Sequence, residues 1–270
     1  MATRGVSLGK TTRPSFAGIL PRERLFAWLD QARSRRVIWV TGPPGSGKTS
    51  LVASYIEHRK LQSLWYHLDE SDTDAASLFY HLELAVAEIP RGKAPPLPKL
   101  TPEYQAGLPA FVRRFAHAAF QRAGGDFVAV FDSYQQMPAQ SQFHELMRDA
   151  LQEVPPGRCV ILISRTEPPP IMARLRVSQE MAVLGRNELR LTQQESTAIV
   201  ASRGHPLSER ALVDLYERTQ GWPAGLILLL EYADGPEALE APADFTAFWV
   251  SAIATARQVP PQNTRRGRSG

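Results

Sequence analysis

Apolar residues recur along the chain in two alternating patterns, which together predict an α/β fold. Runs of β-branched and aromatic residues predict strands at Val37–Thr41, Ser63–Leu68, Phe127–Asp132 and Cys159–Ser164, with a weaker fifth at Glu180–Leu184. Between these runs, apolar residues return every three or four positions, as on one face of a helix. This alternation predicts a three-layer αβα arrangement around a five-stranded, mainly parallel sheet.

The helices between the strands are predicted from their apolar faces. They span residues 25–32, 48–58 and 143–151, and two more carry the faces Leu78, Phe79, Leu82, Ala85 and Leu108, Phe111, Val112, Phe115, Ala119. Asp72 or Thr73 is the expected N-cap of the first of those two faces. Residues 90–102 are rich in proline, so we expect a surface excursion without regular structure there.

The last third of the chain has the pattern of a small helical domain. Thr192 and Glu195 form a capping box that opens a helix. Gly221 suits a left-handed cap after the helix 211–219, and Pro223 suits the first position of the next helix. We therefore expect four regions: a flexible N-terminus (1–15), an α/β core (16–186), a helical lid domain (187–233), and a linker with a disordered basic tail (234–270).

The loop after the first strand has the spacing Gly-x-x-x-x-Gly-Lys-Thr and runs directly into a helix. Its glycines allow successive amides to converge on an anion, and the helix adds its positive dipole end. Lys48 is expected to contact the β- and γ-phosphates, while the Thr49 hydroxyl holds Mg²⁺. The predicted cofactors are ATP or ADP with Mg²⁺, and the candidate nucleotide-binding residues of the loop are Gly42, Pro43, Pro44, Gly45, Ser46, Gly47, Lys48, Thr49 and Ser50.

Asp132 ends a strand whose preceding residues are all apolar. Its carboxylate is the second expected Mg²⁺ ligand beside Thr49. NTPases of this plan commonly place a second acid at the next position, where this chain has Ser133. Loss of a positioned base costs on the order of 10²- to 10⁴-fold in rate, so binding and turnover are separate questions. Asp69 or Glu70, after the second strand, is an alternative base.

Arg165 follows the fourth strand and is the third candidate catalytic residue, with Lys48 and Asp132. Because the carboxyl ends of parallel strands share one edge of the sheet, we expect Arg165 to lie near the loop. It either reads the γ-phosphate or forms an ordinary surface ion pair.

Composition narrows the location and the partners. The chain has 270 residues, a formal net charge of +4 and an ordinary apolar fraction, and its one cysteine, Cys159, lies in an apolar run, as a buried thiol would. No apolar stretch is long enough to cross a bilayer and the N-terminus has no signal core, so we expect a cytoplasmic protein without membrane contact. The arginines near the C-terminus are typical of a solvated tail. The chain has no helix-turn-helix pattern, so we do not expect it to bind DNA directly.

Seven segments together carry a resemblance to a known family. They are Leu20-Pro21-Arg22-Glu23-Arg24-Leu25, the loop Gly42 to Thr49, Leu68-Asp69-Glu70-Ser71-Asp72, Phe131-Asp132, Ser164-Arg165-x-x-Pro168-Pro169, Ala173-Arg174-Leu175-Arg176 and Gly221-Trp222-Pro223-Ala224-Gly225-Leu226. Over roughly residues 16 to 232, the chain resembles the ATPase module of MalT-like, LuxR-type transcriptional regulators, which are P-loop ATPases of the STAND signalling class.

The resemblance implies a nucleotide switch and further site residues. ATP or ADP would lie between the α/β core and the helical lid, with Arg165 as the sensor arginine. Pro223 would pack near the adenine, and Pro21 and Arg22 would line the base from the N-terminal side. Ser133 departs from the paired acids of the family. Such regulators are usually far longer, with a repeat-built sensor and a DNA-binding domain, so the chain resembles a truncated form.

Three functions remain open from the sequence. The first is an ATP-binding signalling switch with weak or slow ATPase activity that changes self-association or the binding of a protein partner. The second is a nucleotide-dependent interaction scaffold that does not hydrolyse ATP, as Ser133 suggests. The third is a small-molecule kinase, which would use the same loop and for which Arg174 and Arg176 are candidate phosphate ligands.

Overall fold

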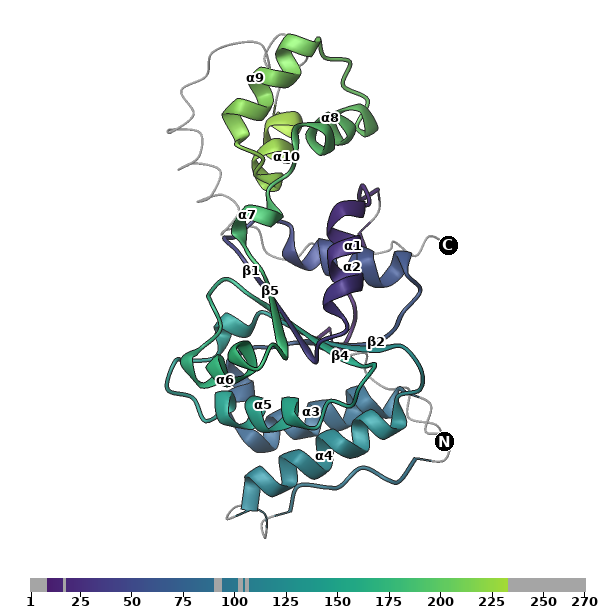
Figure 1. The fold of residues 1–270 in the computed structure, drawn as a ribbon, viewed down its shortest axis with the longest axis vertical. Helices are drawn as coiled ribbons and strands as arrows, with labels where there is room; N and C mark the ends of the chain where they lie inside the picture. Colours follow the sequence, from purple (N-terminus) through teal and green to yellow (C-terminus); the bar gives the residue numbers. More distant parts are fainter. Residues whose placement is uncertain (1–8, 17, 90–93, 102–103, 105–106, 233–270) are drawn as a thin grey trace, which may run out of the picture.

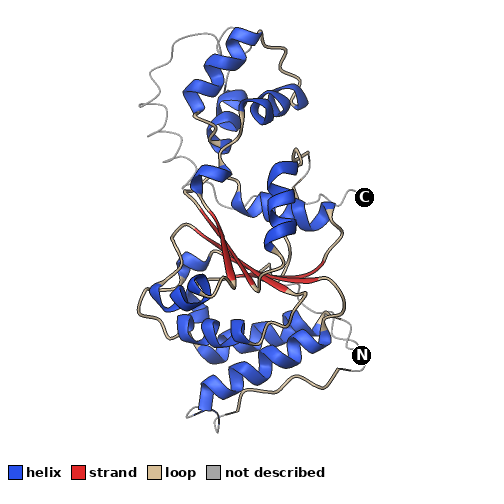
Figure 2. Cartoon of the chain, viewed as in Figure 1, coloured by secondary structure: helices blue, strands red, loops and turns tan. Residues whose placement is uncertain are grey.

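The fold is built on one parallel sheet, shown in Figures 1 and 2. The computed structural model describes residues 9–16, 18–89, 94–101, 104 and 107–232. Within them, five strands lie in the order β2–β3–β4–β1–β5, and every pairing is parallel. The strands are β1 (Val37–Thr41), β2 (Gln62–His67), β3 (Phe127–Asp132), β4 (Cys159–Ser164) and β5 (Met181–Leu184). The predicted α/β fold class is therefore confirmed.

Helices cover both faces of the sheet, and a group of three helices lies beyond one end of it (Figure 1). Helices α1 and α2 lie on one face and α3 to α6 on the other, while α8 to α10 form the separate group, which we call the lid after its predicted role. The helices are α1 (Glu23–Ala32), α2 (Lys48–His58), α3 (Ala75–Ala87), α4 (Leu108–Arg122), α5 (Phe143–Gln152), α6 (Ala173–Val177), α7 (Arg186–Leu189), α8 (Gln193–Ser202), α9 (Glu209–Thr219) and α10 (Pro223–Tyr232), with short 3₁₀ turns η1 (Glu70–Thr73), η3 (Tyr134–Gln136) and η4 (Pro170–Met172).

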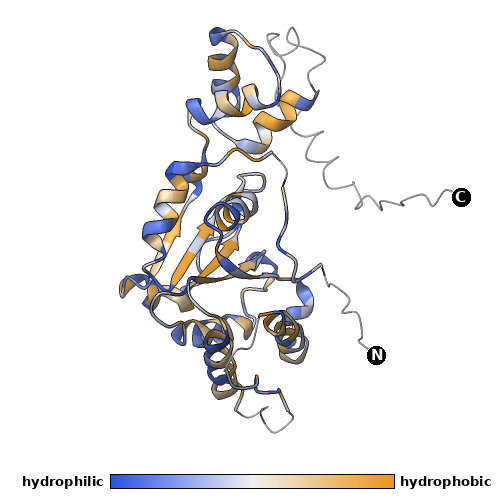
Figure 3. Cartoon of the chain, turned by 90° about the vertical axis from the view of Figure 1, so that its right-hand side faces the viewer, coloured by the Kyte–Doolittle hydropathy of each residue, from blue (hydrophilic) through white to orange (hydrophobic). Residues whose placement is uncertain are grey.

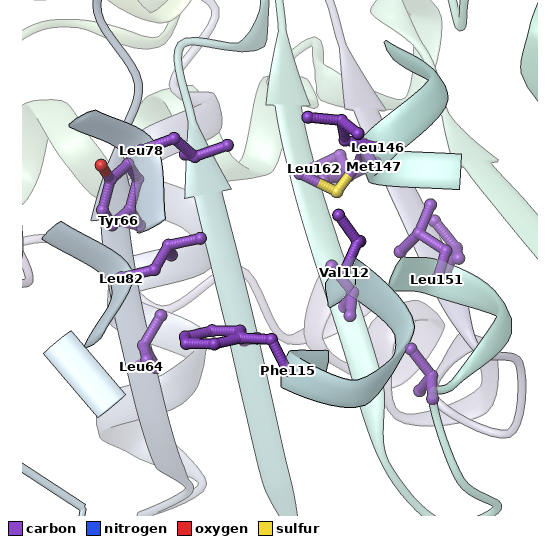
Figure 4. Close-up of a cluster of buried hydrophobic side chains, with 14 of the residues drawn as sticks. Leu64, Tyr66, Leu78, Leu82, Val112, Phe115, Leu146, Met147, Leu151 and Leu162 are labelled. Atoms are coloured by element: carbon purple, nitrogen blue, oxygen red, sulfur yellow. The ribbon is translucent and has the colours of Figure 1, made fainter. Parts of the chain in front are cut away.

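Successive strand residues serve opposite faces of the sheet. Val37 and Trp39 belong to the cluster under α3, α4 and α5, whereas Ile38 and Val40 belong to the cluster under α1 and α2. A strand buried on both faces needs an apolar side chain at every position, which is why the strands read as continuous runs (Figure 3). Figure 4 shows the first cluster, in which Leu78, Leu82, Val112, Phe115, Leu146, Met147 and Leu151 from the helices face Leu64, Tyr66 and Leu162 on the strands.

The N-terminal segment is anchored in part, which the expectation of a flexible stretch over 1–15 did not foresee. Residues 1–8 lie outside the described residues, but Lys10 Nζ lies 2.8 Å from Asp69 Oδ1 and 3.0 Å from Asp72 Oδ1. The Lys10 carbonyl also accepts a 2.7 Å hydrogen bond from the amide of His67 on the edge strand β2. Asp69, one of the alternative bases, is thus committed to an ion pair, and Lys10 and Ser71 hold its pKa below the ordinary value although burial opposes this.

The predicted N-cap of α3 was wrong by one or two residues. Asp74 caps the helix by accepting a hydrogen bond from the Ser77 amide. Asp72 instead accepts from the Tyr66 hydroxyl at 2.8 Å and from the Asp69 amide at 2.9 Å, in a buried position. Neither predicted residue is available for the cap, since Asp72 has these partners and the Thr73 hydroxyl donates to the carbonyl of Glu70 at 2.7 Å.

The lid has a core of its own. Six buried side chains form it, namely Leu191, Val200, Leu215, Leu226, Leu229 and Leu230. The capping box at Thr192 and Glu195 is confirmed, as is the start of α10 at Pro223. Two consecutive residues after α9 are left-handed, Gln220 with φ of 50° and Gly221 with φ of 71°. The cap therefore includes Gln220 as well as the predicted Gly221.

The division into a core of 16–186 and a lid of 187–233 remains a proposal. The predicted linker and tail, 234–270, lie outside the described residues, and the proline-rich stretch has no regular structure over its described part, 94–101. Within the part of the chain that the structure describes, no helix is both long and apolar enough to cross a bilayer.

Candidate functional site

Strands β1, β3 and β4 bring the predicted site residues to one edge of the sheet. All three run parallel, and β4 lies between the other two. The loop 42–47 leaves the end of β1, while Asp132 ends β3 and Arg165 follows β4. Ligands of such sheets bind at the carboxyl ends of the strands.

The loop has the backbone geometry of an anion cradle. Gly45 and Gly47 have φ of 72° and 79°, in the left-handed region that favours glycine, and Gly47 is the N-cap of α2. Among the described residues, no group accepts a hydrogen bond from the amides of Gly47, Lys48 or Thr49. These donors therefore suit a phosphate, and α2 adds its positive dipole end.

Lys48 is buried beneath this loop. Its ammonium group donates to the carbonyls of Gly42 at 2.7 Å and Pro43 at 2.9 Å. Burial and, to a smaller extent, the charge of Arg165 lower the pKa of Lys48 to about 8, and the carboxylate of Asp132 opposes both. The lysine thus lies within electrostatic reach of both predicted catalytic partners, and an anion in the loop would favour its charged form.

Thr49 and Asp132 are in direct contact. The Thr49 hydroxyl donates to Asp132 Oδ2 at 3.0 Å, and the amide of Ser133 donates to Asp132 Oδ1 at 2.7 Å. Asp132 is 5% exposed, so its carboxylate is held in one orientation. Hydroxyl and carboxylate oxygens are ligands that suit Mg²⁺. The structure brings together the two residues predicted to hold the metal.

Arg165 is exposed, but its backbone is fixed on two sides. Its amide donates to Gln135 Oε1 at 3.1 Å. The next carbonyl, that of Thr166, accepts 3.0 Å hydrogen bonds from Trp39 Nε1 and Thr41 Oγ1 on β1. Within the described part of the chain, the Arg165 guanidinium forms no ion pair, so the alternative of an ordinary surface ion pair finds no partner there.

The lid contacts the loop directly. Trp222 Nε1 donates to the carbonyl of Pro44 at 3.1 Å, and the Ala224 amide donates to the carbonyl of Gly45 at 3.0 Å. A Cβ atom added to Gly45 would lie 2.5 Å from the Cβ of Ala224. Gly45 is therefore needed for this close approach as well as for its positive φ.

A pocket of about 430 Å³ opens where the loop meets the lid. It is lined by Pro43, Pro44, Ser46, Arg186, Leu189, Arg190, Thr219, Gln220, Gly221, Trp222 and Pro223. Pro223, the first residue of α10, belongs to this lining and lies close to Gly47, and its contact with the base stays a prediction.

Pro21 and Arg22 do not line this pocket. Pro21 is exposed, and the buried Arg22 donates to the carbonyls of Leu189 at 3.0 Å and Arg190 at 2.7 Å and to Glu195 at 3.1 Å. The described structure therefore gives Arg22 a role in holding the lid, which differs from the base contact that the resemblance implies.

Arg22, Arg24 and Glu195 form an ion cluster between α1 and α8, which we name the clamp. Glu195 Oε1 lies 3.1 Å from Arg24 Nε, and Glu195 Oε2 accepts from the Thr192 amide at 2.9 Å. Burial raises the pKa of Glu195, but hydrogen bonds from Arg22 and Thr192 outweigh it, and the net pKa is below the ordinary value. The clamp therefore fixes the start of the lid to the start of the core.

Sequence reasoning missed Gln135, the Trp222 indole and Glu195 as site residues. Gln135 is a polar residue three positions after the strand-ending Asp132, which is the one signal that was present. Glu195 was recognised only as a capping residue, although it accepts hydrogen bonds from Arg22 and Arg24 as well. A local pattern shows the capping role because it lies within four residues, and it cannot show partners that lie some 170 positions away.

Comparison with known proteins gives three kinds of match: a family model, sequence relatives and a solved structure. A family model described as "Nephrocystin 3, N-terminal" matches residues 16–94. The HTH-type transcriptional regulator MalT of Yersinia enterocolitica is 29% identical over 211 residues, which is 77% of this chain and 23% of that protein. MalT of Yersinia pestis is 28% identical over 223 residues, which is 82% of this chain and 24% of that protein.

These matches confirm the predicted resemblance to the P-loop module of MalT-like regulators. The chain spans about a quarter of the length of the curated relatives it matches. Among solved structures, the Orc1 protein of Aeropyrum pernix in complex with DNA covers 90% of this chain and 70% of its own, at 16% identity and a TM-score of 0.47. A similarity at that TM-score says nothing about what this chain binds.

Proposed function

We propose that the chain is an ATP-binding signalling module that switches state with the γ-phosphate and hydrolyses ATP slowly. The observation that carries this proposal is the contact between Thr49 and Asp132, with Lys48 beneath the loop and Arg165 at the same edge of the sheet. Similarity to MalT regulators supports the same reading.

The residues present fit a magnesium nucleotide. The amides of Gly47, Lys48 and Thr49 form a donor set aimed at an anion, and the buried ammonium group adds a charge that an anion would complement. Bound Mg²⁺ would neutralise part of the phosphate charge. Thr49 and Asp132 would hold it, and the Ser133 amide keeps the Asp132 carboxylate oriented toward Thr49.

The lid would report on the nucleotide because it rests on the same loop. Trp222 and Ala224 hold carbonyls of Pro44 and Gly45, and the base would lie in the adjoining pocket beside Pro223. A ligand that orders the loop would therefore change the affinity of the loop for the lid, and the reverse follows by thermodynamic linkage. A changed lid position is how we expect self-association or partner binding to respond to ATP.

The direct test is nucleotide affinity. Mg-ATP and Mg-ADP should bind the wild type, and Lys48→Ala should weaken ATP binding by about 10- to 100-fold, since several charge-assisted hydrogen bonds lose one donor. Lys99→Ala, on the exposed proline-rich segment, is the matched control and should bind like the wild type. Equal ATP affinity of the wild type and Lys48→Ala would overturn the proposal.

A second candidate function is a scaffold that binds the nucleotide without turnover. Ser133 favours it, because a serine cannot act as a general base at ordinary pH and Asp69 is engaged by Lys10, which leaves the exposed Glu70 as the remaining alternative base. A steady-state phosphate-release assay separates the two functions. Magnesium-dependent release that Asp132→Asn abolishes would exclude the scaffold, and the absence of release from a protein that binds ATP would establish it.

The kinase reading gains no observation from the site, since Arg174 and Arg176 are exposed on the five-residue helix α6. A cytoplasmic location, a protein partner or self-association, and the lack of direct DNA contact remain proposals, as does any role of the longer MalT proteins. The truncation suggested by the sequence is also untested by the structure.

A further inference from the structure

Gln135 joins the two ends of the site that the proposed function assigns to metal and to γ-phosphate. It lies in η3, the turn that follows Asp132, and its side-chain oxygen accepts the amide hydrogen of Arg165 at 3.1 Å. The two residues are thirty positions apart in the chain. The bond exists because β3 and β4 are parallel neighbours whose carboxyl ends lie side by side.

Thr166, the residue after Arg165, is held from the other side of β4, by side chains of β1. Trp39 Nε1 and Thr41 Oγ1, both on β1, donate to the carbonyl of Thr166 at 3.0 Å. The Thr166 amide donates to Ser164 Oγ at 3.1 Å. The backbone at Arg165 and Thr166 is thus hydrogen-bonded on one side to the turn that follows Asp132 and on the other to β1, the strand before the phosphate loop.

The turn that carries Gln135 is itself rigid. Ser133 takes a left-handed conformation with φ of 65°, and Tyr134 is 2% exposed. The Tyr134 ring meets the edge of Trp39 at a centroid distance of 4.8 Å, and its hydroxyl lies 2.9 Å from His144 Nδ1. A side chain mounted on such a turn has a defined position, which a positioning role requires.

We propose that Gln135 is a positioning residue that sets the Arg165 guanidinium relative to Asp132, so that γ-phosphate recognition depends on the turn that orients the metal-holding carboxylate. This inference rests on the proposed nucleotide function. It adds a residue outside the loop and outside the predicted catalytic set. Gln135 acts through Arg165 and has no contact with the nucleotide in this scheme.

The chemistry of glutamine suits this task better than that of an acid. An amide oxygen accepts the backbone N–H without adding charge, so the guanidinium stays available for an anion. A carboxylate at the same position would pair with Arg165 and compete with the γ-phosphate for it. The neighbouring Gln136 belongs to the same turn but is exposed, and its side chain has no bond to Arg165, so it is a control for the loss of a glutamine from this turn.

The test compares affinities for ADP and for a non-hydrolysable ATP analogue, both with Mg²⁺. Gln135→Met keeps the length of the side chain and removes the acceptor, and we expect it to lower the ATP-over-ADP preference about 3- to 10-fold, the range of one hydrogen bond. Affinity for ADP and the melting temperature should not change. Gln136→Met is the matched control and should keep the wild-type preference.

Two further variants test the route through Arg165. In an Arg165→Ala background, Gln135→Met should have no additional effect, because the residue through which it acts is gone. Gln135→Glu keeps an acceptor for the amide but adds a competing charge, so the ATP preference should fall while ADP affinity is retained.

Each contrary outcome is distinguishable. A wild type that binds neither nucleotide overturns the proposed function. A wild type that prefers ATP, with Gln135→Met and Gln135→Glu preferring it equally, overturns the role of Gln135 alone. Equal loss of ADP and ATP affinity in Gln135→Met, an additive effect with Arg165→Ala, or a wild type that binds ATP and ADP equally also overturns that role.

Discussion

In the core, helices cover both faces of the sheet and the buried apolar side chains form two large clusters, whereas the lid encloses one cluster of six. The contacts between the two regions also differ in kind. The lid meets the core mostly through polar contacts, namely the clamp, the bonds from Arg22 to the carbonyls of Leu189 and Arg190, and single hydrogen bonds from Trp222 and Ala224 to the loop. The Leu189 side chain, in the joining helix α7, is buried in the cluster under α1 and α2. Buried apolar area is lost only by unfolding, but polar contacts are exchangeable with water. The core therefore fixes the geometry of the site, and the lid is the part able to respond to a bound nucleotide.

The largest effect is expected in the core. Phe111 is fully buried and its ring meets that of Phe79 at a centroid distance of 4.9 Å. Phe111→Ala should reduce the free energy of unfolding by about 3–5 kcal/mol, because it removes apolar contacts and leaves a cavity. Denaturant unfolding measures this, with Val213→Ala on the lid surface as the control. A loss below 1 kcal/mol would contradict the assignment of this cluster as the main source of stability.

The next effect concerns the seam between loop and lid. Gly45→Ala should weaken lid docking by about 2–3 kcal/mol, since the new Cβ would lie 2.5 Å from the Cβ of Ala224 and φ is positive. Removing that Cβ in the double variant Gly45→Ala, Ala224→Gly should recover part of the loss. Amide hydrogen exchange at residues 222–226 reads lid docking, and equal exchange in the single and double variants would refute a steric cause.

A smaller effect is expected at the clamp. Glu195→Gln removes the charge that Arg22 and Arg24 share. We expect it to weaken the free energy of lid docking by about 1–2 kcal/mol, a range that allows for the partial exposure of Arg24. Exchange at the lid amides should rise while core amides keep their protection. Glu217→Gln, on the exposed side of α9, is the control. A uniform rise over the core and the lid would mean that the two regions open together.

The same carboxylate predicts a dependence on pH. The pKa of Glu195 lies below its ordinary value of 4.5 in the folded state, so its stabilising contribution is present above that value. It is lost as pH falls through the depressed pKa, because protonation removes the charge that the arginines bind. The difference in unfolding free energy between the wild type and Glu195→Gln should therefore be constant near neutral pH and shrink below about 4.5. A difference that grows as the pH falls below about 4.5 would contradict the sign.

The smallest effect belongs to one hydrogen bond. Trp222→Phe keeps an aromatic ring and removes the donor to the Pro44 carbonyl, so we expect about 0.5–1.5 kcal/mol of weaker lid docking. Trp28→Phe, on α1, is the control for loss of an indole elsewhere. A change in the exchange of core amides would show that Trp222 also supports the sheet.

Local pattern predicted the elements well because burial on both faces leaves a continuous apolar run. The bounds of β1, β3, β4 and α2 were predicted to the residue, whereas the order of the strands in the sheet was not predicted, because it depends on pairings between distant segments. The cap of α3 was missed because the choice among Asp72, Thr73 and Asp74 depended on Tyr66 and Lys10. The roles of Arg22 and Gln135 were missed for the same reason, since their partners come from distant segments.

The close approach of the lid to Gly45 gives the glycines of the loop a second cause besides phosphate binding. Part of that pattern is imposed by a neighbouring helix and not by phosphate, since any side chain at this position would meet Ala224. A descendant that had stopped binding nucleotides but kept its lid docked would still need glycine there. Gly45 is therefore required by lid docking as well as by the shape of the loop, whereas Thr49 and Asp132 are assigned to the proposed ligand.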